Sequence, residues 1–197
     1  WANAFSRCTG EPYYHSLDQP HRAMTHLSIN LNKIALIRNS RTTSFPDPCE
    51  FAKLSIEAGA QGITVHPRPD QRHIRAQDCI NIAESISVEF NIEGNPFSQS
   101  KDCHRGEISP YPGFMPLIER IKPEQVTLVP DSDDQLTSNQ GFNILRDGDR
   151  LLPVIENLRG WGIRVSIFMD PDPRQIELIP QLGAQRIELY TERYANA

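Results

Sequence analysis

The sequence is poor in cysteine, and its few cysteines form no recognisable framework. Four are present, Cys8, Cys49, Cys79 and Cys103, and no two of them make a CxxC pair. Zinc sites and disulfide-rich domains depend on short, repeated cysteine spacings. We therefore expect no metal site and no disulfide network, and we expect the protein to work in a reducing cytoplasm.

Long apolar runs and a surplus of basic residues are also missing. No apolar stretch approaches the ~20 residues that a bilayer span requires, and the mean hydropathy is -0.48. The formal net charge of -5 argues against a general nucleic-acid binder, because such proteins carry a broad basic surface. We expect a soluble protein that binds neither a membrane nor nucleic acid.

The first residues carry no folding signal. Residues 1–23 have neither the apolar core of a signal peptide nor a helical or strand period. Met24 follows them directly, so we expect it to be the natural start and the preceding residues to be a disordered extension or an artefact. The remaining residues, 24–197, are enough for a single well-buried domain.

Six short segments rich in β-branched residues are typical of strands. They cover residues 27–31, 62–66, 88–92, 125–129, 164–169 and 186–190. Helices are predicted between them at 48–58, 75–87, 114–121, 149–161 and 173–183. Their clearest signal is an aspartate at the N-cap followed by proline, at Asp47-Pro48 and again at Asp172-Pro173. Residues 32–41, 94–112 and 131–141 are polar without a period, so we predict loops there.

The alternation of strands with helices predicts βαβ units and a parallel sheet. A doubly wound open sheet and a (β/α)8 TIM barrel both have this pattern. No GxGxxG turn follows the first strand, which argues against the doubly wound sheet. Polar residues end strand after strand, at the position where barrels carry their chemistry. We therefore predict an α/β fold, a TIM barrel truncated after about six βα units with the last two absent.

The stretch from Gly62 to His73 is the most informative for function. Its β-branched residues run directly into His66, and two prolines then prevent the strand from continuing. Two arginines and a second histidine follow. An isolated motif of this kind is typical of a solvated basic loop, but here polar residues end other strands too. Basic residues confined to such loops favour a small anionic ligand.

Several segments resemble the pyridoxine 5'-phosphate synthase family, TIM-barrel enzymes of de novo vitamin B6 synthesis. The resemblance covers roughly Met24 to Ala197 and rests on ordered matches near strand ends. The matching segments are Asn30-Leu31-Asn32-Lys33, Arg38-Asn39-Ser40-Arg41, Phe45-Pro46-Asp47-Pro48, residues 58–68, Arg72-His73-Ile74, Asn91-Ile92-Glu93, Leu128-Val129-Pro130, Val165-Ser166-Ile167-Phe168 and Ile187-Glu188-Leu189-Tyr190-Thr191.

The resemblance implies a condensation of 1-deoxy-D-xylulose 5-phosphate with 3-amino-2-oxopropyl phosphate that releases phosphate and water. It implies acid–base roles for His66 and Glu93 and charge stabilisation by Glu188; a surface ion pair is the alternative for Glu188. The implied substrate-binding residues are Asn30, Asn32, Lys33, Arg41, Arg68, His73 and Thr137, with Ser138 as an alternative to Thr137. Arginines among them suit phosphate because a guanidinium donates two parallel hydrogen bonds. No cofactor is implied, and members of the family form homo-oligomers.

The sequence also departs from the family pattern. Asn32-Lys33 stands where most members have Asp-His, and residues 94–112 form an insertion that could act as a lid. The family's proton-donating histidine and part of its phosphate site belong to the seventh and eighth units, which are not in this chain. Two alternatives therefore stay open. One is a non-catalytic barrel that binds phosphorylated metabolites. The other is a phosphosugar aldolase or epimerase, although residues 188–192 offer no Schiff-base lysine.

Overall fold

The computed structural model describes residues 25–40, 44–103, 108–132, 135 and 138–195. The predicted N-terminal extension and two predicted substrate ligands, Arg41 and Thr137, lie outside these residues. Among the helices that are described, none combines the length and apolar character needed to cross a membrane.

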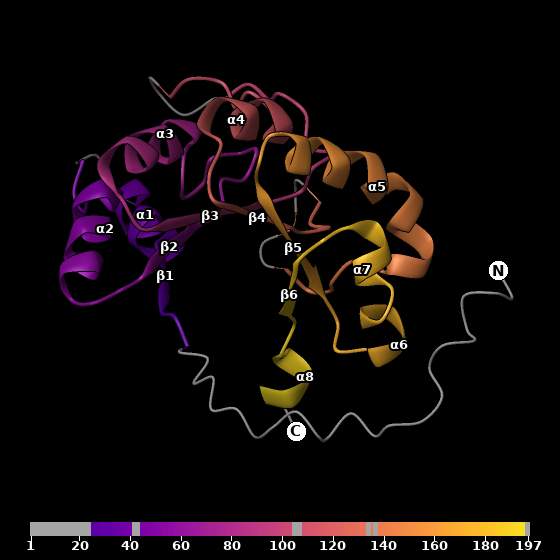
Figure 1. Ribbon diagram of the computed structural model, residues 1–197. Helices are drawn as coiled ribbons and strands as arrows, with labels where there is room; N and C mark the ends of the chain where they lie inside the picture. Colours follow the sequence, from indigo (N-terminus) through magenta and orange to yellow (C-terminus); the bar gives the residue numbers. More distant parts are fainter. Residues whose placement is uncertain (1–24, 41–43, 104–107, 133–134, 136–137, 196–197) are drawn as a thin grey trace, which may run out of the picture.

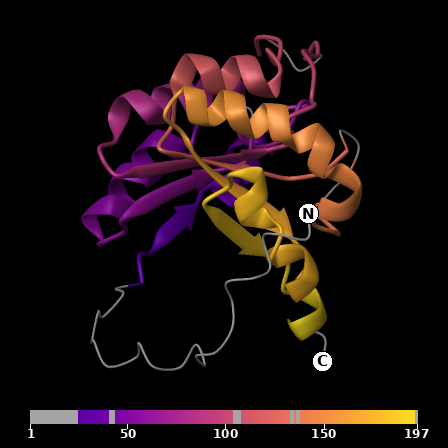
Figure 2. The same cartoon turned by 45° about the vertical axis from the view of Figure 1, so that its right-hand side comes forward.

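One sheet of six parallel strands, in the order of the sequence, forms the centre of the described structure. The strands are β1 (Ser28–Asn30), β2 (Gly62–Val65), β3 (Glu89–Gly94), β4 (Gln125–Leu128), β5 (Arg164–Met169) and β6 (Arg186–Leu189). The sheet curls as part of a barrel does, with helices arranged in an arc on its outer side (Figures 1 and 2). The predicted fold class, a TIM barrel represented by six of its eight βα units, is confirmed.

Eight helices are described between and after the strands. They are α1 (Asn32–Asn39), α2 (Pro48–Glu57), α3 (Ala76–Ser85), α4 (Phe114–Ile121), α5 (Ile144–Gly160), α6 (Pro173–Ile176), α7 (Ile179–Leu182) and α8 (Glu192–Ala195). The Asp47 side chain caps α2 by accepting a hydrogen bond from the Cys49 N–H at 2.8 Å, as the sequence predicts.

Three predictions of helix extent were wrong. Helix α1 occupies residues predicted as a loop, and α5 begins at Ile144, five residues before the predicted start at Asp149. The predicted helix at 173–183 is two short helices, α6 and α7. In each case the local amino-acid composition gave the wrong bounds for the helix. Gly148 weakens the helical signal of α5, yet it is buried within that helix, where packing outweighs propensity.

The apolar core lies between the sheet and the helices. Strand residues that alternate along β2 to β5, such as Ile63, Ile92, Leu128 and Ile167, are fully buried on the outer side of the sheet. Helix residues such as Leu151 pack against them. Because strand side chains alternate between faces, the other residues of each strand point to the inside of the curl.

The inner face of the sheet is polar, and its side chains bond to one another across the strands. The Ser28 hydroxyl lies 2.8 Å from that of Thr64. Asn91 donates to Thr64 at 3.4 Å and accepts a hydrogen bond from the Thr127 hydroxyl at 3.0 Å. These four residues come from β1, β2, β3 and β4, so the row connects one edge strand to the middle of the sheet.

Charged residues close the amino-terminal end of this inner face. Glu89, the first residue of β3, forms ion pairs with Arg164 of β5 and, at 3.1 Å, with Arg186 of β6. Gln125 of β4 accepts hydrogen bonds from both arginines at 2.9 Å. In a flat sheet β3 and β6 would lie about 14 Å apart, so a direct contact between their side chains reflects the curl of the sheet.

A long loop was predicted at residues 94–112, and its described residues after β3 are tied to the carboxyl-terminal side of the sheet. Lys101 and Tyr111 pair through two backbone hydrogen bonds of 2.9 and 2.8 Å. The carbonyl of Ser109 accepts a hydrogen bond from Gln71 at 2.8 Å, in the loop that follows β2. The insertion therefore borders the strand ends, and its predicted role as a lid stays a prediction.

Candidate active site

The carboxyl-terminal ends of β2, β3 and β6 bring a histidine and two glutamates together. His66 directly follows β2, Glu93 lies near the end of β3, and Glu188 is the third residue of β6. The Nδ1 atom of His66 is 3.8 Å from Oε2 of Glu93, and only 9% and 13% of these side chains are exposed. Glu188 alternates with Arg186, which contacts Glu89, so its side chain is on the same inner face of the sheet as that of Glu93, and its charge contributes to the raised pKa of Glu93.

Burial and neighbouring charges shift the proton affinities of these groups. Burial first, and then the charges of Glu188 and Asp131, raise the pKa of Glu93 to about 8, although Arg68 opposes the shift. Burial also raises the pKa of Glu188. Burial and the nearby Arg68 lower the pKa of His66 well below its usual range. At neutral pH the site therefore presents a neutral imidazole, which can accept a proton, beside a protonated carboxyl group, which can donate one.

Two asparagines fix the backbone of His66. The His66 N–H donates to Oδ1 of Asn32 at 2.8 Å. The Asn32 N–H in turn donates to Oδ1 of Asn30 at 2.9 Å. Both asparagines were predicted to bind substrate. In this structure the side-chain oxygen of Asn32 joins the ends of β1 and β2, and that of Asn30 caps the Asn32 N–H. Lys33, the third predicted residue of this segment, is exposed on α1.

His73 lies close to His66, with ring centroids 6.5 Å apart. Its Nδ1 atom accepts a hydrogen bond from the Ile74 N–H at 2.8 Å, so the ring proton of the neutral imidazole is on Nε2. Burial and the charges of Arg68 and Arg72 lower the pKa of His73 to about 4. His73 is therefore a neutral hydrogen-bond donor at physiological pH.

Arg68 is held by an aspartate that the sequence analysis did not single out. Its Nη2 atom lies 2.5 Å from Oδ2 of Asp131, and both side chains are buried. Asp131 comes three residues after the end of β4. The signal that could have identified it was its position, because it follows Val129-Pro130 at a strand end as the other site residues do.

Helix α1 fixes the loop that carries Arg68 and His73. Arg38 makes a bidentate ion pair with Asp78 of α3 at 2.7 and 2.8 Å, and both residues are buried. The amide of Asn39 donates to the carbonyls of Gln71, Arg72 and His73 at 3.4, 3.0 and 2.8 Å. Sequence analysis placed Arg38 and Asn39 in a matching segment without assigning them a role.

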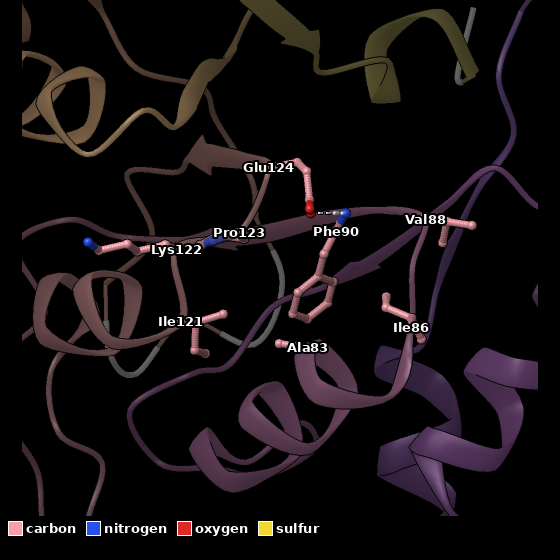
Figure 3. A pocket seen from close by; sticks show the side chains of 8 residues that line it. All are labelled: Ala83, Ile86, Val88, Phe90, Ile121, Lys122, Pro123 and Glu124. Carbon is pink, nitrogen blue, oxygen red and sulfur yellow. Dashed lines mark hydrogen bonds between the residues drawn. The ribbon is translucent and has the colours of Figure 1, made fainter.

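A hollow of about 80 Å³ lies at the opposite end of the sheet, between α3, α4 and the residues that precede β3 and β4 (Figure 3). Six of the eight residues that line it are apolar, and Glu124 accepts a hydrogen bond from the Phe90 N–H at 2.9 Å. A water molecule takes up ~30 Å³ in the liquid. The hollow therefore holds a few waters at most and is too small for a sugar phosphate.

Metal-ligating side chains do not cluster in the part of the chain that the structure describes, where no group of three His, Cys, Asp or Glu residues could hold an ion. Cys49, Cys79 and Cys103 are free thiols.

The fold and the strand-end cluster define a protein of the (β/α)8-barrel class. Within that class, residues 27–197 match the family described as pyridoxal phosphate biosynthesis protein PdxJ, and the chain belongs to this family. The resemblance inferred from the sequence is thereby confirmed.

Relatives named pyridoxine 5'-phosphate synthase are similar over most of the chain. The protein of Xanthomonas campestris pv. campestris (strain B100) is 51% identical over 176 residues, which is 88% of this chain and 66% of the relative. The Porphyromonas gingivalis protein is 48% identical over 174 residues, 88% of this chain and 67% of the relative. That of Xylella fastidiosa is 47% identical over 175 residues and 65% of its length is covered. The chain spans about two thirds of the length of these proteins.

Most of the predicted site residues that the structure describes lie at one end of the sheet. His66, Glu93 and Glu188 converge, and Arg68 and His73 lie beside them. Asn32 accepts a hydrogen bond from the His66 N–H, and Asn30 accepts one from the Asn32 N–H. The predicted roles of these residues in catalysis and binding stay predictions.

Proposed function

We propose that the chain carries out the chemistry of a pyridoxine 5'-phosphate synthase, the condensation of 1-deoxy-D-xylulose 5-phosphate with 3-amino-2-oxopropyl phosphate. The observation that supports this most directly is the neutral His66 beside Glu93, whose raised pKa keeps it protonated at neutral pH. Imine formation, enolisation and dehydration each need a proton to be removed or supplied. A base and an acid within 4 Å of each other meet that need.

In this proposal His66 accepts a proton from the condensing substrates and Glu93 donates one to a departing hydroxyl group. Glu188 stabilises positive charge that develops nearby and keeps the proton on Glu93. Arg68 and the Nε2–H of His73 bind phosphate oxygens, to which Arg41, Lys33 and Thr137 contribute as well. Two dianionic substrates need several such donors, and charge-assisted hydrogen bonds from arginine are the strongest available.

The family membership supports further expectations about the protein as a whole. We propose that residues 24–197 act as one domain, that the working form is a homo-oligomer, and that it acts in the cytoplasm. Its substrates are phosphorylated small molecules, as the names of its relatives suggest.

Mass spectrometry tests the proposed activity. The 197-residue chain, and the same chain extended by the segment of the Xanthomonas campestris relative that it does not span, are each incubated with both substrates. We expect the extended chain to form pyridoxine 5'-phosphate, and the His66→Ala variant to lose at least roughly a hundredfold in rate, as is usual when a general base is removed.

The control is His26→Ala, since His26 is exposed and distant in sequence from the cluster; this variant should keep full activity. An extended chain that is folded and binds both substrates without forming product would contradict the proposal. That outcome would favour the non-catalytic barrel that binds phosphorylated metabolites.

A further inference from the structure

Gln71 has an unusual backbone conformation for a buried residue. It lies in the loop after β2, between Arg68 and His73, and its φ of 51° is in the left-handed region. Residues other than glycine rarely adopt this conformation. Only 1% of Gln71 is exposed. Residues with such a backbone are common at functional sites, where the contacts around them keep them in place.

Both ends of the Gln71 amide are hydrogen-bonded to other segments. Its Nε2 atom donates to the Ser109 carbonyl at 2.8 Å, and its Oε1 atom accepts from the Ala76 N–H at 3.0 Å. Ala76 is the first residue of α3, where an N–H has no partner within the helix. The backbone N–H of Gln71 donates to the Arg68 carbonyl at 2.8 Å and so closes the turn that follows Arg68.

Ser109 belongs to a fixed part of the chain. Two residues later, Tyr111 is buried and pairs with Lys101 through the two backbone hydrogen bonds described above. The Gln71 side chain therefore joins the loop after β2 to residues of the predicted insertion after β3. The turn alone does not account for a glutamine, because glycine adopts a positive φ without strain. The amide accounts for it, since it bonds a donor of α3 and an acceptor of the insertion at once.

We propose that Gln71 is a positioning residue, which holds the loop that carries Arg68 and His73 against Ser109 and α3, so that these two side chains are in place for a phosphate group. This inference rests on the proposed function, in which Arg68 and His73 bind phosphate oxygens. It gives the insertion a part in binding either phosphorylated substrate. Donors that are fixed before a ligand arrives lose less entropy on binding, and this raises the affinity.

Gln71→Gly and Gln71→Met separate the backbone of this residue from its amide. Glycine relieves the backbone strain and removes both side-chain hydrogen bonds. Methionine keeps the length of the side chain and removes the same two bonds. If Gln71 served only the turn, Gln71→Gly would bind phosphate as the parent does. If it positions the loop, both variants lose affinity.

Calorimetric titration of the full chain with inorganic phosphate measures this affinity. We expect both variants to bind phosphate roughly tenfold or more weakly than the parent, because the two donors are no longer preorganised. His73→Gln should also weaken the binding, and this places the phosphate at the loop. Urea denaturation of each variant shows how much of it is folded under the conditions of the titration.

Gln77→Met is the matched control, since Gln77 is exposed on α3 and its amide donates to Asn81 of the same helix; this variant should bind phosphate as the parent does. Unchanged affinity in Gln71→Gly or in Gln71→Met overturns the inference and leaves the proposed function standing. A loss of affinity that only follows a loss of folded protein overturns it too, because Gln71 would then be a structural residue.

A parent chain that binds no phosphate, or whose affinity is unchanged in His73→Gln, contradicts the phosphate-binding roles of Arg68 and His73 and this inference with them. The titration involves no turnover, so failure of the proposed activity in the mass-spectrometric assay is judged separately.

Discussion

At the scale of single residues, Glu93 couples stability to pH. Its pKa is 4.5 in an ordinary environment and about 8 in the folded chain. Between these values the folded state holds a proton that the unfolded state has released. The free energy of unfolding therefore falls as the pH rises from about 4.5 to about 8.

Glu93→Gln removes this dependence because glutamine does not titrate. We expect the variant to gain about 3 kcal/mol on the parent in free energy of unfolding between pH 6 and pH 9. Urea denaturation at the two pH values measures the difference. Glu57→Gln, at an exposed position on α2, should gain nothing. Equal pH profiles for Glu93→Gln and the parent would show that Glu93 is ionised in the folded state at neutral pH.

Single residues also show how far sequence analysis reaches into the site. His66 was singled out because it ends an apolar strand, a position that the local sequence reveals, whereas Glu93 was assigned its role through the resemblance to the family. Asp131 and Asn39 were not assigned roles, because what matters about them are contacts with residues far away in the sequence. Asn39 reaches carbonyls more than thirty positions later, and no local pattern reports such a contact.

At the scale of elements, helix α1 is joined to α3 by the buried pair of Arg38 and Asp78. Truncating one member of such a pair leaves an uncompensated buried charge, which costs about 3–5 kcal/mol. We expect Asp78→Ala to destabilise the chain by about this amount. The double variant Arg38→Met/Asp78→Leu, which buries apolar groups of similar size, should recover at least half of the loss.

Urea denaturation of Asp78→Ala and of the double variant, each compared with the parent, measures the loss of stability and its recovery. Lys53 and Glu50 form an exposed pair 3.4 Å apart on α2, and truncating Glu50 should cost less than about 1 kcal/mol. A double variant as unstable as Asp78→Ala would mean that the loss comes from the α3 N-terminus, where Asp78 accepts a hydrogen bond from the Arg75 N–H.

Elements differ in how well sequence predicts them. Helix α4 and strand β5 were predicted with the bounds that the structure has, because their apolar period is uninterrupted. Helix α1 was missed because the polar and basic residues at its two ends were given more weight than the four apolar residues, 34–37, between them. It becomes a helix because Ala35 and Arg38 are buried against the rest of the fold, and this packing is a tertiary effect.

At the scale of the whole molecule, protection against hydrogen exchange should follow the position of each strand in the sheet. Every residue of β4 is buried, whereas β1 and β6 lie at the two edges of the described sheet and contain exposed residues. Edge strands open with a smaller free-energy change than central ones. We expect amides of β4 to exchange at least roughly tenfold more slowly than those of β6, as measured by mass spectrometry of peptic peptides.

Helix α5, which is exposed along one side, serves as an internal reference for the labelling conditions in the same digest. Equal exchange in β4 and β6 would contradict the expected order and indicate that the sheet opens as one unit.

The sequence predicts the parallel order of the strands, since each is followed by a helix. The polar strand ends also predict a barrel, but they do not predict the contacts that accompany the curl, such as that of Glu89 with Arg186, 97 positions apart.

The polar inner face of the sheet has a consequence for how the protein is made. Because the apolar core lies between strands and helices, each βα unit buries its apolar side as soon as its own helix folds back, without waiting for a barrel to close. A nascent chain leaves the ribosome from its amino terminus, so units one to six are in the right order to dock one after another. We therefore expect the sheet to grow strand by strand during translation, with little apolar surface exposed to chaperones at any stage.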